Sequence, residues 1–80
     1  MSMKTENNKI SEKISKKIKL ERNKRNWSQL ELANRAGTDK NTIWRIEAGQ
    51  VSPNVNTLVK IADAFDMEFI SLMDISKVEL

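Results

Sequence analysis

Apolar residues recur at helical spacing along most of this 80-residue chain. Ile10, Ile14 and Ile18 repeat every four residues with lysines between them, which predicts an amphipathic helix over about residues 9–25. The preceding residues 1–8, MSMKTENN, are polar and lack periodicity, so we interpret them as a flexible N-terminal arm. The strict alternation typical of strands is absent from the sequence.

The next two predicted helices each end at one of the only two glycines of the chain. Ser28 is a favourable N-cap, and a glutamate three residues later completes a capping box. This second helix is expected to cover about 29–36 and to end at Gly37, a left-handed terminator. The third helix is expected to start after Asp39, a good N-cap, and to stop at Gly49.

Two further helices are predicted towards the C-terminus. Asn54 is an N-cap candidate for a helix over about 55–65. The inward face of this helix is expected to comprise Val55, Leu58, Ile61, Ala62 and Phe65. A last short helix is predicted over about 69–74. The fold class is therefore all-α: a compact bundle of five short helices over 9–74, followed by a tail, 75–80.

Composition narrows the range of functions. The chain has neither cysteine nor histidine, so disulfides, thiolate metal sites and the commonest general base are excluded. No nucleophile–base constellation or glycine-rich phosphate loop is present, so we expect no enzyme, no cofactor and no metal site. No apolar run reaches the length of a membrane span, so we expect a cytoplasmic protein without a membrane partner.

The charge is distributed unevenly along the chain, whose formal net charge is +3. Residues 4–25 carry nine Lys/Arg and three Glu, whereas residues 51–80 carry two Lys and five Asp/Glu. A basic surface suits an anionic polymer such as a nucleic acid. The lysines of the first helix are either contacts to such a polymer or solvated charges, and charge alone does not decide between them.

The third predicted helix has two different sides. At about 100° per residue, Ile43, Ile46 and Glu47 fall on one side and would face the body of the domain. The other side carries Lys40, Asn41, Trp44 and Arg45 with the small Ala48. Two helices joined by a tight turn with glycine can form a helix-turn-helix, whose second helix enters the major groove of DNA.

A family resemblance adds specificity to this pattern. The run RNWSQLELANRAGTDKNTIWRIEAGQVSPNVNTLVKIADAF resembles the Cro/C1-type helix-turn-helix domains of phage repressors and small bacterial regulators, the XRE family. The matching positions are Ser28-Gln29, Leu32-Ala33, Gly37, Thr42-Ile43, Arg45-Ile46-Glu47, Gly49, Pro53, Thr57-Leu58 and Ile61-Ala62. The resemblance covers about 10–74 and implies a lambda-repressor-like DNA-binding fold in a bacterial or phage-encoded protein.

The resemblance also implies roles for individual residues. The base-contacting set would be Lys40, Asn41, Trp44 and Arg45. Gln29 would hold a DNA phosphate, and the exposed polar residues Asn34, Arg35 and Gln50 are further phosphate candidates. Arg22 and Glu47 match the positions of a structural ion pair between the first and third helices.

The sequence departs from the family pattern at a few positions. Asn26 stands where glycine is usual. Asp66 and Glu68 replace the usual glycine and serine before the last helix. Asp39 replaces a usual Ser or Thr, and its carboxylate would repel a nearby phosphate.

The two tryptophans have different expected roles. Trp27 directly precedes the cap of the second helix, where a hydrophobic staple would place it in the core. Trp44 either lies against thymine methyl groups in the major groove or folds back over the rim of the core.

The last helix offers a candidate dimer interface. Its apolar residues Phe69, Ile70, Leu72 and Met73 lie on two sides of the helix, so one side would complete the core and the other would meet a second subunit. The tail Ile75, Val78 and Leu80 would extend that patch. The alternative is that all of these residues cover the domain's own core.

Taken together, these features predict a small dimeric transcriptional regulator that binds double-stranded DNA at a palindromic operator, with the third helix, about 40–48, in the major groove. The alternative is an antitoxin-like protein in which the apolar C-terminal surface binds an unknown protein partner and DNA binding is secondary. A membrane-surface role for the basic first helix is not favoured, because its few isoleucines are needed for the core.

Overall fold

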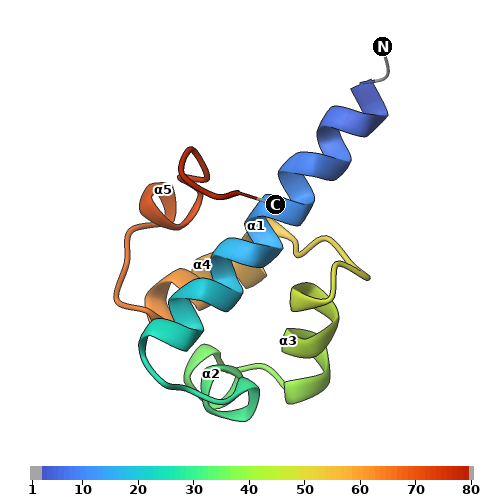
Figure 1. The fold of residues 1–80 in the computed structure, drawn as a ribbon. Coiled ribbons are helices and arrows are strands. Elements are labelled where there is room, and N and C mark those ends of the chain that lie inside the picture. Colours follow the sequence, from blue (N-terminus) through green and yellow to red (C-terminus); the bar gives the residue numbers. More distant parts are fainter. Residues whose placement is uncertain (1–2, 80) are drawn as a thin grey trace.

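The computed structural model describes the backbone of residues 3–79 and the side chains of residues 9–79. This part of the chain forms five helices and no strand, as predicted. In chain order the helices are α1 (Met3–Lys24), α2 (Gln29–Ala36), α3 (Lys40–Glu47), α4 (Val55–Ala64) and α5 (Phe69–Leu72). In Figure 1, α1 runs diagonally through the bundle, with α3 on one side of it and α5 on the other.

Helix α1 is longer than the sequence indicated. It begins at Met3, so residues 3–8 are helical rather than an irregular arm, whereas residues 1–2 lie outside the described residues. No glycine or proline interrupts this segment, so the helix that Ile14 and Ile18 anchor in the bundle continues towards the N-terminus. Its first turns project beyond the other helices (Figure 1).

The three predicted N-caps are confirmed by hydrogen bonds from backbone amides to cap side chains. The bonds are Glu31 N to Ser28 Oγ at 3.0 Å, Thr42 N to Asp39 Oδ1 at 2.7 Å and Thr57 N to Asn54 Oδ1 at 2.8 Å. The carboxylate of Glu31 accepts a bond from Arg35 Nε at 2.6 Å. These caps give α2 and α3 the starting positions that the sequence predicted.

Four residues in the turns have left-handed backbones. Gly37 and Gly49, at φ 69° and 74°, end α2 and α3 as predicted. Asn26 and Asp66 adopt φ of 58° and 57°, a region that Asn and Asp tolerate better than most side chains. Asn26 and Asp66 therefore adopt the left-handed conformation for which the resembled family usually has glycine at these two positions. The turn before α5 forms with Asp66 in place of that glycine.

The core lies where α1, α2, α3 and α4 meet. Its buried members are Ile18, Leu32, Ala33, Ala36, Ile43, Ile46, Leu58, Ile61, Ala62, Phe65 and Leu72. Trp27 packs against this cluster, and its ring stacks on Phe65 with the centroids 5.7 Å apart, so its predicted core location is confirmed. Val55 does not belong to the inward face of α4, because its side chain is 63% exposed. Side chains in a helix lean towards its N-terminus. The side chain of Val55, the first residue of α4, therefore projects beyond the start of the helix.

The last helix ends at Leu72, two residues earlier than predicted. Leu72 has no exposed surface and Val78 is buried, so the structure corrects their assignment to a dimer interface. Met73 also packs against the core, whereas Ile70 is 74% and Phe69 38% exposed. One side of this segment therefore completes the domain and the other side is open. Leu80 lies outside the described residues.

A bidentate ion pair joins α1 to α3. Arg22 Nε donates to Glu47 Oε2 at 2.7 Å, and Arg22 Nη2 donates to Glu47 Oε1 at 2.9 Å. The remaining amino group, Nη1, donates to the carbonyl of Trp27 at 2.7 Å. The hydrogen bonds to Glu47 hold the pKa of the Arg22 guanidinium above its ordinary value, although burial opposes them. All three donor groups of Arg22 therefore have a hydrogen-bond partner in a mostly buried environment.

No helix in the described part of the chain is long and apolar enough to cross a membrane.

Replacing Arg22 by lysine tests the importance of this geometry. The Arg22→Lys variant keeps the charge but cannot make the planar, two-point contact with Glu47 and the bond to the Trp27 carbonyl together. We expect the free energy of unfolding in urea to fall by about 2 kcal/mol, because charge-assisted hydrogen bonds are lost in a mostly buried site.

The matched control is Arg35→Lys, in the Arg35–Glu31 pair. That pair is about half exposed on both sides, so its loss is expected to cost less than about 0.5 kcal/mol. Equal losses for the two variants would contradict a special role for the Arg22–Glu47 pair.

Candidate nucleic-acid interface

Helices α2 and α3 are joined by a turn of three residues and pack closely on each other. Leu32 and Ala33 from α2, and Ile43 and Ile46 from α3, have at most 1% of their surface exposed. The N-cap of each helix and the left-handed glycine between them fix where one helix ends and the other begins. The pair therefore forms a rigid helix-turn-helix, with α3 held by α1 on one side and by α2 on another.

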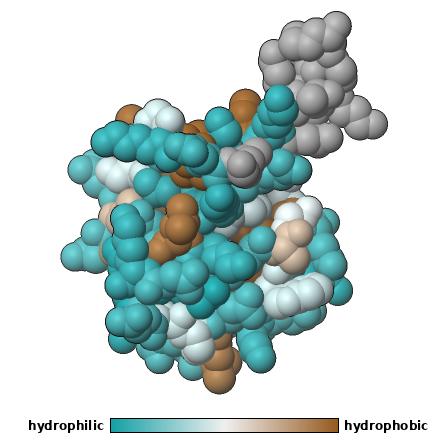
Figure 2. All heavy atoms as spheres, viewed as in Figure 1, coloured by the Kyte–Doolittle hydropathy of each residue, from teal (hydrophilic) through white to brown (hydrophobic). Residues whose placement is uncertain are grey.

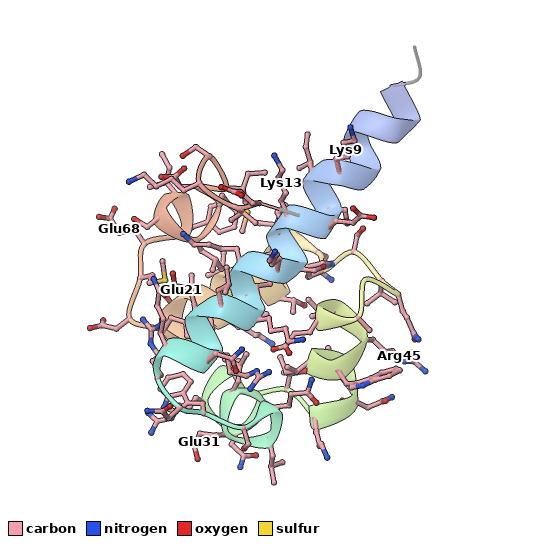
Figure 3. The ribbon with its side chains drawn as sticks, viewed as in Figure 1. Lys9, Lys13, Glu21, Glu31, Arg45 and Glu68 are labelled. Carbon is pink, nitrogen blue, oxygen red and sulfur yellow. The ribbon has the colours of Figure 1, made fainter. Side chains whose placement is uncertain are left out.

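The outer side of α3 carries the side chains that the sequence assigned to base contacts. Lys40, Asn41, Trp44 and Arg45 are all exposed, and 46% of the Trp44 surface is accessible. Figure 3 shows Arg45 on the side of α3 that faces away from α1. The structure thus brings all four side chains together on one surface, which offers hydrogen-bond donors, one acceptor and an apolar ring.

A carboxylate stands at the N-terminal end of this surface. The hydrogen bond from the backbone of Thr42 lowers the pKa of Asp39 below its ordinary value, so this side chain is charged at neutral pH. It caps α3, and it also places a negative charge one residue before Lys40. A DNA phosphate approaching this end of α3 would meet that charge.

The four residues predicted to contact phosphates have different surroundings. Asn34 and Gln50 are exposed. Arg35 pairs with Glu31 and lies over the ring of Trp27, 4.3 Å from its centroid. Gln29 starts α2 and donates from Nε2 to Glu47 Oε1 at 3.2 Å. Gln29 and Arg35 lie at opposite ends of α2, so these four residues do not form one cluster.

A recess that the sequence did not reveal lies between α1 and the exposed face of α3. It has a volume of about 120 Å³ and is lined by Lys19, Gln29, Trp44, Glu47 and Ala48. Lys19 also lines a larger cleft of about 350 Å³ that shares Glu47 and Ala48 with the recess. One feature of the sequence indicates where this recess lies. Lys19 precedes Arg22 by three residues, so it lies on the side of α1 that meets α3.

The face viewed in Figure 2 is mostly hydrophilic, and its apolar side chains form separate patches rather than one continuous surface. Hydrogen-bonding and charged groups therefore dominate the part of the molecule around α1 and α3 in this view. Such a surface favours a polar, charged partner over a large apolar one.

Comparison with known proteins agrees with this geometry. A helix-turn-helix family model matches residues 18–72, which include all of α2, α3, α4 and α5. No curated protein and no solved structure matches the chain. The matched residues make up more than half of the sequence, and the all-α bundle is consistent with a lambda-repressor-like fold. The chain belongs to the Cro/C1-type helix-turn-helix family of DNA-binding regulators, the XRE family.

Proposed function

We propose that this chain binds a specific double-stranded DNA sequence by placing α3 in the major groove and that it acts as a dimeric transcriptional regulator. The observation that carries the proposal is the contrast between the two sides of α3. Ile43 and Ile46 fix one side in the core, and an exposed surface of hydrogen-bonding side chains occupies the other. A helix of this kind fits the width of the major groove.

Three residues of α3 would read base edges. The guanidinium of Arg45 matches the two acceptors of guanine, O6 and N7. The amide of Asn41 can both donate to and accept from adenine at N7 and N6. Lys40, at the start of the helix, would reach a guanine or a phosphate. Around the helix axis, Trp44 projects between Lys40 and Asn41 on the same face.

Contacts to phosphates would position the domain without reading sequence. Gln29 at the start of α2 supports this role, because helix N-termini favour negative groups and the second N–H of its amide has no protein partner in the described residues. Asn34, Arg35 and Gln50 are the further candidates, and Arg35 would have to leave Glu31 to reach a phosphate.

A two-fold dimer would bring two reading helices to one DNA site. Ile70 and Phe69 on α5 support this proposal, because they are exposed apolar side chains next to each other. Half-sites about 34 Å apart would match one turn of DNA and give a palindromic operator. The same apolar patch favours a second candidate function, in which an antitoxin-like chain uses α5 to bind another protein.

Selection of bound duplexes from a random DNA pool tests this function. We expect an enriched palindromic sequence that contains guanines in each half-site. An unenriched pool would contradict sequence-specific binding, and a single, non-palindromic site would contradict the dimer.

Truncating Arg45 tests base reading. We expect Arg45→Ala to weaken binding to the selected duplex roughly 10- to 100-fold, because a bidentate contact to guanine is lost. Binding to a scrambled duplex should change far less. Fluorescence anisotropy titrations of both duplexes provide the measurement, and equal losses on the two would show that Arg45 does not read bases.

A charge placed on α5 tests the dimer. Ile70→Arg is expected to convert a dimer into a monomer in sedimentation equilibrium, because a charge in an apolar interface is unpaired and poorly solvated. Leu30→Arg, at a leucine on α2 that is 52% exposed, is the matched control and should leave the mass unchanged. A monomeric unsubstituted chain would contradict the dimer and favour the protein-binding alternative.

A further inference from the structure

The larger cleft lies between α1 and the C-terminal end of α3. Its volume of about 350 Å³ falls within the ~300–1,000 Å³ that is typical of small-molecule sites. Ala48 and Gly49 line one side of it and bring little side chain into the space, since a Cβ atom added to Gly49 would meet no atom within 4 Å. The connection after α3 lies beside α1 (Figure 1), where the hydroxyl oxygens of Ser11 and Ser52 are 3.0 Å apart.

Ser15 is the feature of this cleft that the protein itself does not explain. It lines the cleft from α1 and is only 4% exposed, and its hydroxyl has no hydrogen-bond partner among the described residues. A buried hydroxyl without a partner is costly, and folded proteins contain few of them. A serine inside a helix can bond to the carbonyl four residues earlier, but Ser15 does not. The unused hydroxyl therefore indicates a ligand in the cleft, to which it can bond after rotating about χ1.

Two charged side chains in the lining are already engaged. The Lys16 ammonium donates to the backbone carbonyl of Glu79, so Lys16 offers the cleft mainly its aliphatic stem. The carboxylate of Glu47 accepts hydrogen bonds from Arg22 and Gln29. Neither group is therefore available to hold a charged ligand.

The remaining charges of the lining lie at its two ends and have opposite signs. Glu12 and Lys19 are both exposed, and neither has an ion-pair partner among the described residues. Seven residues separate them on α1, so they lie on the same side of the helix and about 10 Å apart along its axis. Ser15 lies between them, one turn from Glu12.

We propose that this cleft binds a small linear zwitterion. Its ammonium group contacts Glu12 and donates to the hydroxyl of Ser15, its carboxylate contacts Lys19, and its methylene chain lies along the stem of Lys16. The spacing of the charges selects this class of ligand. An ω-amino acid with several methylene groups can reach both ends of the cleft, whereas an α-amino acid carries both charges on one carbon.

The position of the cleft gives the ligand a consequence for α3. A ligand in it would contact α1 and also the end of α3, whose mutual position is set by the Arg22–Glu47 pair. A ligand that contacts both helices binds more tightly to the arrangement in which they are held together. We therefore expect the bound zwitterion to raise the affinity for DNA, a consequence that rests on the proposed function.

Three probes of equal chain length test the site without DNA. ε-Aminocaproate carries both charges, caproate carries only the carboxylate, and hexylamine carries only the ammonium. Each is titrated at neutral pH into the isotope-labelled chain, and the amide chemical shifts report binding. We expect saturable shifts at residues 12–19 and 47–49, with ε-aminocaproate binding roughly 2- to 5-fold more tightly than either other probe.

Substitutions at the two ends assign the charges. Glu12→Gln should bind ε-aminocaproate no better than caproate, and Lys19→Met should bind it no better than hexylamine. Lys60→Met and Asp63→Asn are the matched controls, because both residues are exposed on α4 and lie outside the lining. The controls should bind all three probes as the unsubstituted chain does.

Removing the hydroxyl of Ser15 tests its role separately. Ser15→Ala should weaken binding of the two ammonium probes roughly 2- to 10-fold and leave caproate unaffected, because one hydrogen bond to the ammonium is lost. Its thermal unfolding midpoint should not fall, since the hydroxyl that it removes is unpaired. A lower midpoint would show that the hydroxyl has a partner within the protein and would contradict the proposed role.

Several results of the titrations would overturn the site. An absence of saturable shifts with ε-aminocaproate would leave only a water-filled cleft. Equal affinities for the three probes, or control variants that change binding as much as Glu12→Gln and Lys19→Met do, would contradict the two charged ends.

The effect on DNA binding is measured separately by fluorescence anisotropy of the selected duplex, with and without saturating ε-aminocaproate. We expect the affinity to rise roughly 5-fold or more and the rise to disappear in Glu12→Gln. Linkage requires the affinity for ε-aminocaproate to rise by the same factor when the duplex is bound. An unchanged or lower affinity for the duplex would overturn this coupling. If the unsubstituted chain bound no duplex, the proposed function would fail, whereas the titrations alone would still decide the ligand site.

Discussion

The position of α3 depends on the bidentate ion pair between Arg22 and Glu47. Arg22 contacts both carboxylate oxygens and also the carbonyl of Trp27, so one side chain joins α1, α3 and the connection before α2. Glu47 accepts a further bond from Gln29, the first residue of α2. A mostly buried charge without its partner is expensive, and this cost favours the single orientation in which all of these groups are satisfied.

This orientation separates the two sides of α3. Ile43 and Ile46 are buried in the core, whereas Lys40, Asn41 and Arg45 on the other side of the helix are exposed. An eight-residue helix would be marginal by itself, so its caps and its packing must hold it in place. A helix held in this way can present Asn41 and Arg45 to a partner with little further loss of conformational entropy, which is what specific recognition requires.

Local signals in the sequence were sufficient for most of the fold, and tertiary contacts explain the remainder. Caps and left-handed turns depend on a few neighbouring residues, so the bounds of α2 were predicted correctly. The sequence does not reveal the start of α1, because residues 3–8 are polar and lack apolar periodicity, although they contain no helix-breaking glycine or proline. Val55 is exposed and Leu72 is buried. An amphipathic pattern therefore does not specify which of the apolar residues on a helix pack into the core. The recess at Lys19 needs three helices to form, so sequence spacing could indicate only its side of α1.

The central claim is that the outer side of α3 lies in the major groove. Methylation of the selected duplex by dimethyl sulfate tests this directly, because guanine N7 is exposed in the major groove and adenine N3 in the minor groove. We predict that the bound protein protects guanine N7 in two half-sites about one helical turn apart and leaves adenine N3 between them reactive. Protection of adenine N3 with reactive guanine N7 throughout would contradict the account, because it would place the protein in the minor groove.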